Sequence, residues 1–221
     1  MATSPRFSSD HLPLAQDELS CGSPLELAKG RRGRWRGLLV MGGGSLLLLA
    51  CAPTPIFPPE IMDKADRSLT FKEVIAHPAE YEGRVVEFGG QILSSMVEGE
   101  EVQLLVRELP IQSKPVYGPV DRGGFRGMFV IRYAGKVGEQ DLQRGNMVVV
   151  IGPMIGAVVT TMTDVPVSRP TVSAECVHFW RTQGEPIEDY PYPKNSSRFV
   201  PLVQQTYCIG RPTTILTTTT P

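Results

Sequence analysis

The sequence predicts a mainly β protein built around one small antiparallel barrel of five to six strands, with one short N-terminal helix. Two observations point to this class. Short apolar segments alternate with turn residues, and glycines lie where a small barrel turns its corners. The sequence also contains no alternation of strands with helices and no long amphipathic helix. Together these features are typical of an OB-like barrel.

The predicted helix begins near residue 70. Thr70-Phe71-Lys72-Glu73 is a capping box, in which the threonine hydroxyl and the glutamate carboxylate each accept a bond from a backbone N–H group at the start of the helix. Leu69 and Val74 occupy the positions of a hydrophobic staple. Pro78 disfavours helical geometry at the residue before it, so we expect the helix to end at His77.

The strands follow this helix. They are expected at Val85–Ile92, Glu101–Arg107, Gly127–Tyr133, Met147–Gly152 and Thr171–Trp180, with Gly156–Thr160 continuing the fourth strand after a break at Pro153. The paired Gly89 and Gly90 indicate a bend or bulge. Strand alternation places five residues of the last strand on one face, namely Val172, Ala174, Cys176, His178 and Trp180.

Residues 1–50 have the features of an export signal. Arginines gather at 31–36, and the apolar stretch 38–50 is too short to cross a bilayer as a helix. Leu48-Leu49-Ala50-Cys51 resembles the lipobox of bacterial lipoproteins, which implies cleavage before Cys51 and acyl chains on its thiol. A buried core helix or an uncleaved signal anchor remains the alternative.

The chain divides into four expected parts. Residues 1–50 form the signal peptide, 51–68 a proline-rich extended tether, 69–182 the barrel domain, and 183–221 a Pro/Thr-rich tail that we expect to be disordered. Removal of the first 50 of 221 residues would leave 171, enough for one domain with a core.

Charge and cysteine content limit the possible functions. The whole chain carries 22 basic and 23 acidic residues, and without its leader the net charge is near −3, so the sequence gives no basic footprint for nucleic acid. Cys21 lies in the leader, which leaves Cys176 and Cys208 as a possible disulfide in an oxidising compartment. The alternative is a buried thiol and an unpaired tail cysteine. No cysteine or histidine spacing indicates a zinc site, and no motif indicates a cofactor.

Several segments, in order along the chain, resemble the Slp family of starvation-inducible outer-membrane lipoproteins of Gram-negative bacteria. They are Phe57–Ile61, Tyr81–Gly90, Glu101–Ile111, Gly145–Gly152 and Val177–Trp180. The sequence departs from the family at Met128, where the family tends to show arginine, and it lacks a Tyr-x-Tyr-Pro pattern before Val172. The resemblance implies a lipid anchor in the outer membrane, a link to stress or stationary phase, and no catalytic activity.

Two possible chemistries remain. Cys176 and His178 are two residues apart on one strand and could form a nucleophile–base pair, although core residues share a face in the same way. Glu98, Glu100 and Glu101 at a hairpin tip are more typical of a solvated turn than of a calcium site. We therefore expect a non-enzymatic, periplasm-facing envelope protein that contacts another envelope protein or the cell wall. The alternative is a binding module for a cell-wall or lipid fragment.

Overall fold

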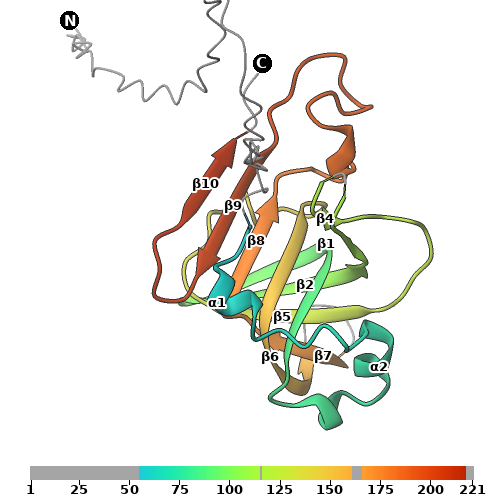
Figure 1. Cartoon of the computed structure of the whole chain (residues 1–221), viewed down its shortest axis with the longest axis vertical. Coiled ribbons are helices and arrows are strands. Elements are labelled where there is room, and N and C mark those ends of the chain that lie inside the picture. The colour runs from blue at the N-terminus through green and yellow to red at the C-terminus, as the bar shows by residue number, and fades with distance from the viewer. Residues whose placement is uncertain (1–54, 115, 161–165, 218–221) are drawn as a thin grey trace, which may run out of the picture. The chain divides into compact units, whose positions relative to one another are not determined.

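A closed five-stranded barrel forms the centre of the computed structural model, which describes residues 55–114, 116–160 and 166–217 (Figure 1). Its strands are β1 (Val85–Glu98), β2 (Glu101–Leu109), β5 (Met128–Ala134), β6 (Met147–Thr160) and β7 (Val167–Ser173). They are hydrogen-bonded in the order β1-β2-β5-β7-β6, and a β1–β6 pairing closes the ring. The mainly β, OB-like prediction is confirmed. One pairing, β5 with β7, is parallel rather than antiparallel, because β6 crosses between them in sequence.

The barrel interior holds the first apolar core. Alternate residues of β6 point inward, including Val148 and Val150. The helix α2 (Phe71–Ala76) adds Phe71 and Val74 at one end of the barrel, where the Phe71 ring packs edge-on to Phe88 at 5.3 Å between centroids. The capping box at Thr70 and Glu73 is present as predicted, and the helix ends before His77.

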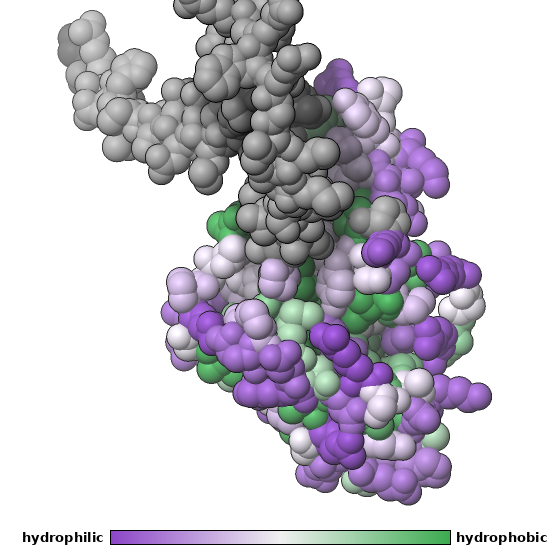
Figure 2. All heavy atoms as spheres, in the orientation of Figure 1, coloured by the Kyte–Doolittle hydropathy of each residue, from purple (hydrophilic) through white to green (hydrophobic). Residues whose placement is uncertain are grey.

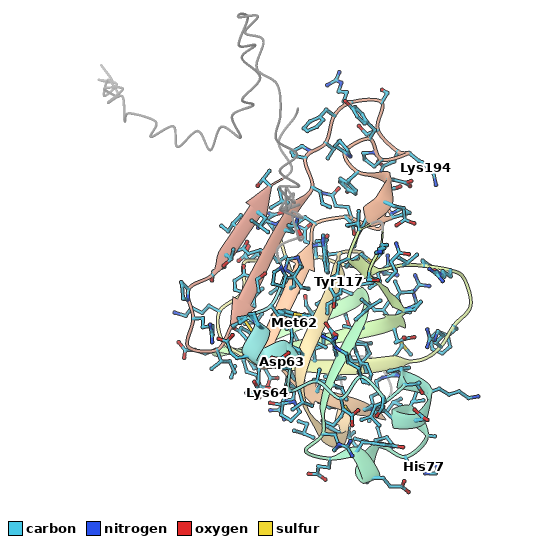
Figure 3. The ribbon with its side chains drawn as sticks, in the orientation of Figure 1. Met62, Asp63, Lys64, His77, Tyr117 and Lys194 are labelled. Carbon is cyan, nitrogen blue, oxygen red and sulfur yellow. A yellow bond between two sulfur atoms is a disulfide. The ribbon has the colours of Figure 1, made fainter. Side chains whose placement is uncertain are left out.

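A second apolar core lies outside the barrel, on the opposite face of the same sheet. The intervening residues of β6, Met147, Val149 and Ile151, point into it. It is covered by the segment around Phe57, by the short helix α1 (Pro59–Met62) and by Ile187 at the 3-10 turn η2 (Ile187–Asp189). Tyr117, labelled in Figure 3, packs against this core and donates its hydroxyl to Glu87 of β1. Because β6 is covered on both faces, its sequence over 147–151 is continuously apolar.

Three more strands extend the sheet beyond β6. They are β8 (Cys176–Trp180), β9 (Val203–Cys208) and β10 (Thr214–Thr217), paired antiparallel in that order (Figure 1). The expected disorder of 183–221 is therefore wrong over much of its length. β9 gains its hydrogen bonds from β8, and β10 gains its hydrogen bonds from β9; proline content and polarity alone do not reveal these partners.

The segment after the leader is also different from the expected tether. Phe57 is 1% exposed and Ile61 is buried in the second core, so the domain begins well before residue 69. Residues 55–58 lead directly into α1, and this part of the chain lies against the sheet instead of spacing it from the membrane.

Other differences concern the strands. The last expected strand is divided at Ala174 and Glu175 into β7 and β8. Both pair with β6, but the neighbour on their other side changes from β5 beside β7 to β9 beside β8. The alternation of faces shifts by one residue at this division, so Val172 and Ala174 point into the first core while Cys176 and Trp180 point into the second. β6 runs through Pro153 without a break, and its register shift falls after Met154.

The paired glycines of β1 allow β2 to pack closely against β1 and do not form a bulge. The β1–β2 register is unbroken at Gly89 and Gly90, and its shift lies between Ile92 and Ser94. A Cβ atom on Gly90 would lie 2.2 Å from the carbonyl oxygen of Arg107. No larger residue fits there without moving the neighbouring strand.

Short accessory elements complete the described chain. They are the 3-10 turn η1 (Pro78–Tyr81) and the ribbon of β3 (Ile111–Gln112) with β4 (Gly118–Pro119). Among the described residues, no helix is long and apolar enough to cross a membrane. The visible face is mostly hydrophilic, with smaller apolar areas between the polar side chains (Figure 2).

Candidate functional site

The lipidation site predicted at Cys51 lies outside the described residues, but the segment that follows it does not. Pro55 is the first residue described. The Ile56 carbonyl accepts a 3.2 Å hydrogen bond from the Thr206 hydroxyl of β9, and Phe57 is buried in the second core. A fixed attachment to the sheet thus begins within six residues of Cys51.

A groove of about 370 Å³ runs between this segment and the β9–β10 hairpin. Its walls are mostly apolar: residues 55–59 form one side, and Thr206, Cys208, Arg211, Pro212, Thr214 and Leu216 form the other. We call it the N-terminal groove. Arg211 pairs with Glu60 of α1 and so ties the hairpin to the N-terminal segment.

The cysteines of β8 and β9 meet at the edge of this groove. Cys176 and Cys208 lie directly opposite each other in the β8–β9 register, with Cα atoms 4.1 Å apart, and the structure joins them in a disulfide. The bond closes the loop that contains 183–202. It holds β9, and through it the groove wall, against the second core.

His178 is buried beside this bond and has no exposed surface. Its Nδ1 atom lies 2.6 Å from the Thr206 hydroxyl, its Nε2 atom 3.2 Å from the Gln204 side-chain oxygen, and its ring 4.2 Å from that of Trp180. Burial lowers the pKa of His178 to about 4. In the structure, the sulfur of the hypothetical nucleophile Cys176 is therefore bonded to Cys208, and the imidazole of the hypothetical base His178 is too buried to reach a substrate.

An ion pair with a buried carboxylate crosslinks the domain just beyond the end of β8. Asp141 is fully buried and accepts hydrogen bonds from Arg181 Nε at 2.6 Å and from the Tyr207 hydroxyl at 2.7 Å. Burial, followed by the hydrogen bond to Asp141, raises the pKa of Tyr207. Sequence reasoning did not find this group, because Arg181 and Tyr207 lie 40 and 66 residues from Asp141 along the chain.

A second, smaller groove lies on the outer face of the barrel. It has a volume of about 210 Å³ and is lined by Met96, Glu98, Gln103, Val130, Arg132, Val158, Val159 and Thr171. The Arg132 guanidinium donates to both oxygens of Glu101, at 2.7 and 2.9 Å, and this pairing lowers the pKa of Glu101. OB-type barrels bind ligands on the corresponding face. None of the described residues that line this groove is aromatic.

Two glutamates of the acidic hairpin tip form ion pairs with basic side chains. Glu101 pairs with Arg132, and Glu100 lies 3.8 Å from Lys136. Within the described ranges, no group of three or more His, Cys, Asp or Glu side chains is arranged to hold a metal ion.

Comparison with protein families decides the identity of the chain. The model of the outer membrane lipoprotein Slp family matches residues 48–211, which include the end of the apolar leader, Cys51, the barrel and the disulfide. The chain belongs to the outer membrane lipoprotein Slp family. The resemblance drawn from the sequence is thereby confirmed, and the protein is a lipid-anchored protein of the outer membrane.

The family match ends at Arg211, so the groove wall formed by β10 lies beyond it. Comparisons with curated proteins and with solved structures gave no match.

Proposed function

We propose that this Slp-family protein works without catalysis, as a lipid-anchored domain that Cys51 holds close to the outer membrane and that acts through contact with other envelope components on the periplasmic side. The observation that carries the proposal is the docking of residues 55–62. With Phe57 buried and Ile56 bonded to Thr206, the anchor is continuous with a folded surface rather than with a long flexible spacer.

The geometry around Cys176 and His178 supports a contact role over hydrolysis. A catalytic base must reach the substrate proton, and a nucleophilic cysteine must be free as a thiolate. Here His178 is enclosed by Trp180, Thr206 and Gln204, and the Cys176 sulfur is bonded to Cys208.

The anchor is tested by expressing the full chain in a Gram-negative host with Cys51→Ser and, as the matched control, Cys21→Ser. The wild type and the Cys21 variant should incorporate labelled palmitate, lose the leader and partition into detergent with the outer-membrane fraction. Cys51→Ser should do none of these. Equal behaviour of the two variants would refute the assignment of Cys51.

The contact role is tested by crosslinking in intact cells. We expect the wild type to give discrete crosslinked products with an envelope protein or with peptidoglycan, and Cys51→Ser to lose them. A wild-type protein that is anchored but gives no product at saturating reagent contradicts the contact role. Comparing expression in growing and stationary cells tests the link to stress.

A second candidate function is the binding of a cell-wall fragment in the barrel-face groove. The position of that groove, on the face that OB-type barrels use, favours it. Titration with soluble peptidoglycan fragments should then produce saturable heat, and Gln103→Ala should weaken it while the exposed Gln143→Ala does not. Absence of heat with the wild type would dismiss this candidate.

A further inference from the structure

The position of the anchor limits where the membrane can lie relative to the domain. Four peptide units separate Cys51 from Pro55, and an extended chain spans at most about 3.6 Å per residue. The acylated residue therefore lies within about 14 Å of Pro55, whatever path the chain takes between them. Pro55 itself lines the N-terminal groove, together with Leu216 of β10.

The surface at this position is apolar and nearly free of charge. Ile215 is 61% and Leu216 is 44% exposed, and the two side chains project from opposite faces of β10. The sequence contains no charged residue from Cys51 to Pro59 and one, Arg211, from Phe199 to Pro221, although 20% of the whole chain is charged. Arg211 is neutralised by Glu60.

Within the described part of the chain, β10 is also the edge strand of the eight-stranded sheet and pairs with β9 alone. Exposed edges in water-soluble domains are commonly protected by lysine, proline or a bulge. The four residues of β10, Thr-Ile-Leu-Thr, have none of these and are all exposed. In the headgroup region of a bilayer, such an edge keeps hydrogen-bonding partners in water and lipid ester oxygens while its apolar side chains leave water.

From these observations we infer that residues 55–59 and the β9–β10 hairpin form a lipid-contacting surface, with β10 resting on the leaflet that holds the Cys51 acyl chains. Ile215 and Leu216 enter the boundary between headgroups and acyl chains, and the N-terminal groove opens toward the lipid. The inference rests on the proposed anchoring through Cys51. It adds that the domain has one fixed orientation on the membrane.

A second copy of the chain is the competing occupant, since two β10 edges could pair. The short link to the anchor argues for lipid, because it brings the bilayer to this surface in every molecule at any protein concentration. A partner copy would have to enter between the surface and the membrane.

The test uses acylated protein reconstituted into vesicles of phosphatidylethanolamine with a minor share of phosphatidylglycerol. An environment-sensitive fluorophore is attached at Leu216→Cys, at Ile215→Cys or, as the control, at His77→Cys. Figure 3 places His77 at the opposite side of the domain from β10, and its imidazole is exposed. Spin-labelled phospholipid serves as the quencher.

We expect a blue shift and loss of emission with spin-labelled lipid at both β10 positions, and neither effect at His77. Labels on β10 that stay water-exposed in a normally acylated, vesicle-bound protein would overturn the inference while leaving the anchor intact. Labels that are shielded but unquenched, together with β10–β10 crosslinks, would assign the surface to a second copy and overturn it as well. A wild-type protein that is not acylated would instead refute the proposed function.

Discussion

Lowering the pH should destabilise this domain through one buried group, His178. Its imidazole is fully buried, and burial holds its pKa near 4, against an ordinary value of 6.5. Between these two values the unfolded chain binds a proton that the folded chain does not. The stabilising effect of a neutral His178 is therefore complete above pH 6.5 and is lost as the pH falls from 6.5 toward 4.

The size of the effect follows from the two pKa values. One pKa unit corresponds to about 1.4 kcal/mol, so the domain should lose about 2 kcal/mol of unfolding free energy from this group between pH 7.5 and pH 5. The loss should approach about 3 kcal/mol near pH 4. This is a large share of the stability of a typical domain.

The assay is urea unfolding of residues 51–221 carrying Cys51→Ser, followed by tryptophan fluorescence from pH 7.5 to pH 4. Carboxylates also titrate in this range, so the quantity to compare is the difference between the parent and His178→Gln, which has no proton to gain. His77→Gln is the matched control, because that imidazole is exposed.

We expect His178→Gln to be less stable than the parent at pH 7.5, since it packs less well against Trp180, but to lose about 2 kcal/mol less on acidification to pH 5. His77→Gln should follow the parent. Parallel curves for the parent and His178→Gln would refute the reasoning, because they would show that His178 takes up its proton equally in both states.

Three further predictions concern the contacts that hold the tail and the N-terminal segment. Paired Cys176→Ser and Cys208→Ser, which open a link of 32-residue separation, should lower the unfolding free energy by about 3–4 kcal/mol, and mass spectrometry of the unreduced parent should find no free thiol. Arg181→Met leaves the Asp141 carboxylate buried without its cation and should cost about 3 kcal/mol in urea unfolding, whereas Lys194→Met on the surface should cost under about 0.5. Phe57→Ala should cost about 3–5 kcal/mol and, unlike Tyr192→Ala, should open 55–62 to limited proteolysis. Unchanged unfolding midpoints would contradict each assignment.

The elements that the sequence predicted well depend on neighbouring residues. The capping box at Thr70 satisfies the first turn of α2 with groups three residues apart, so its signal is contained in a few positions. The continuous apolar content of 147–152 likewise identifies a buried strand without reference to its partners. The lipobox is read in the same way, from charge, length and a cysteine in order along the chain.

The elements that it predicted poorly depend on distant partners. The segment 203–208 forms β9 because β8 offers an open edge and Cys176 offers a disulfide, neither of which is visible in the tail itself. Residues 172–178 show a regular alternation, yet the outer neighbour of the chain changes from β5 to β9 at Glu175, and the residues that face the interior shift by one. A pattern of period two predicts faces correctly only while the strand keeps the same neighbours.

The sequence by itself therefore determined the cellular location of the protein, its fold class and its barrel strands, because each of these is encoded by composition and short-range spacing. Tertiary structure alone decided that His178 is sealed, that Asp141 joins Arg181 and Tyr207, and that residues 55–59 meet β10 in an apolar groove. Those arrangements join residues 28 to about 160 positions apart. They arise from strand pairing and shared burial between distant segments. The local sequence of one such segment does not indicate which other segment it will contact.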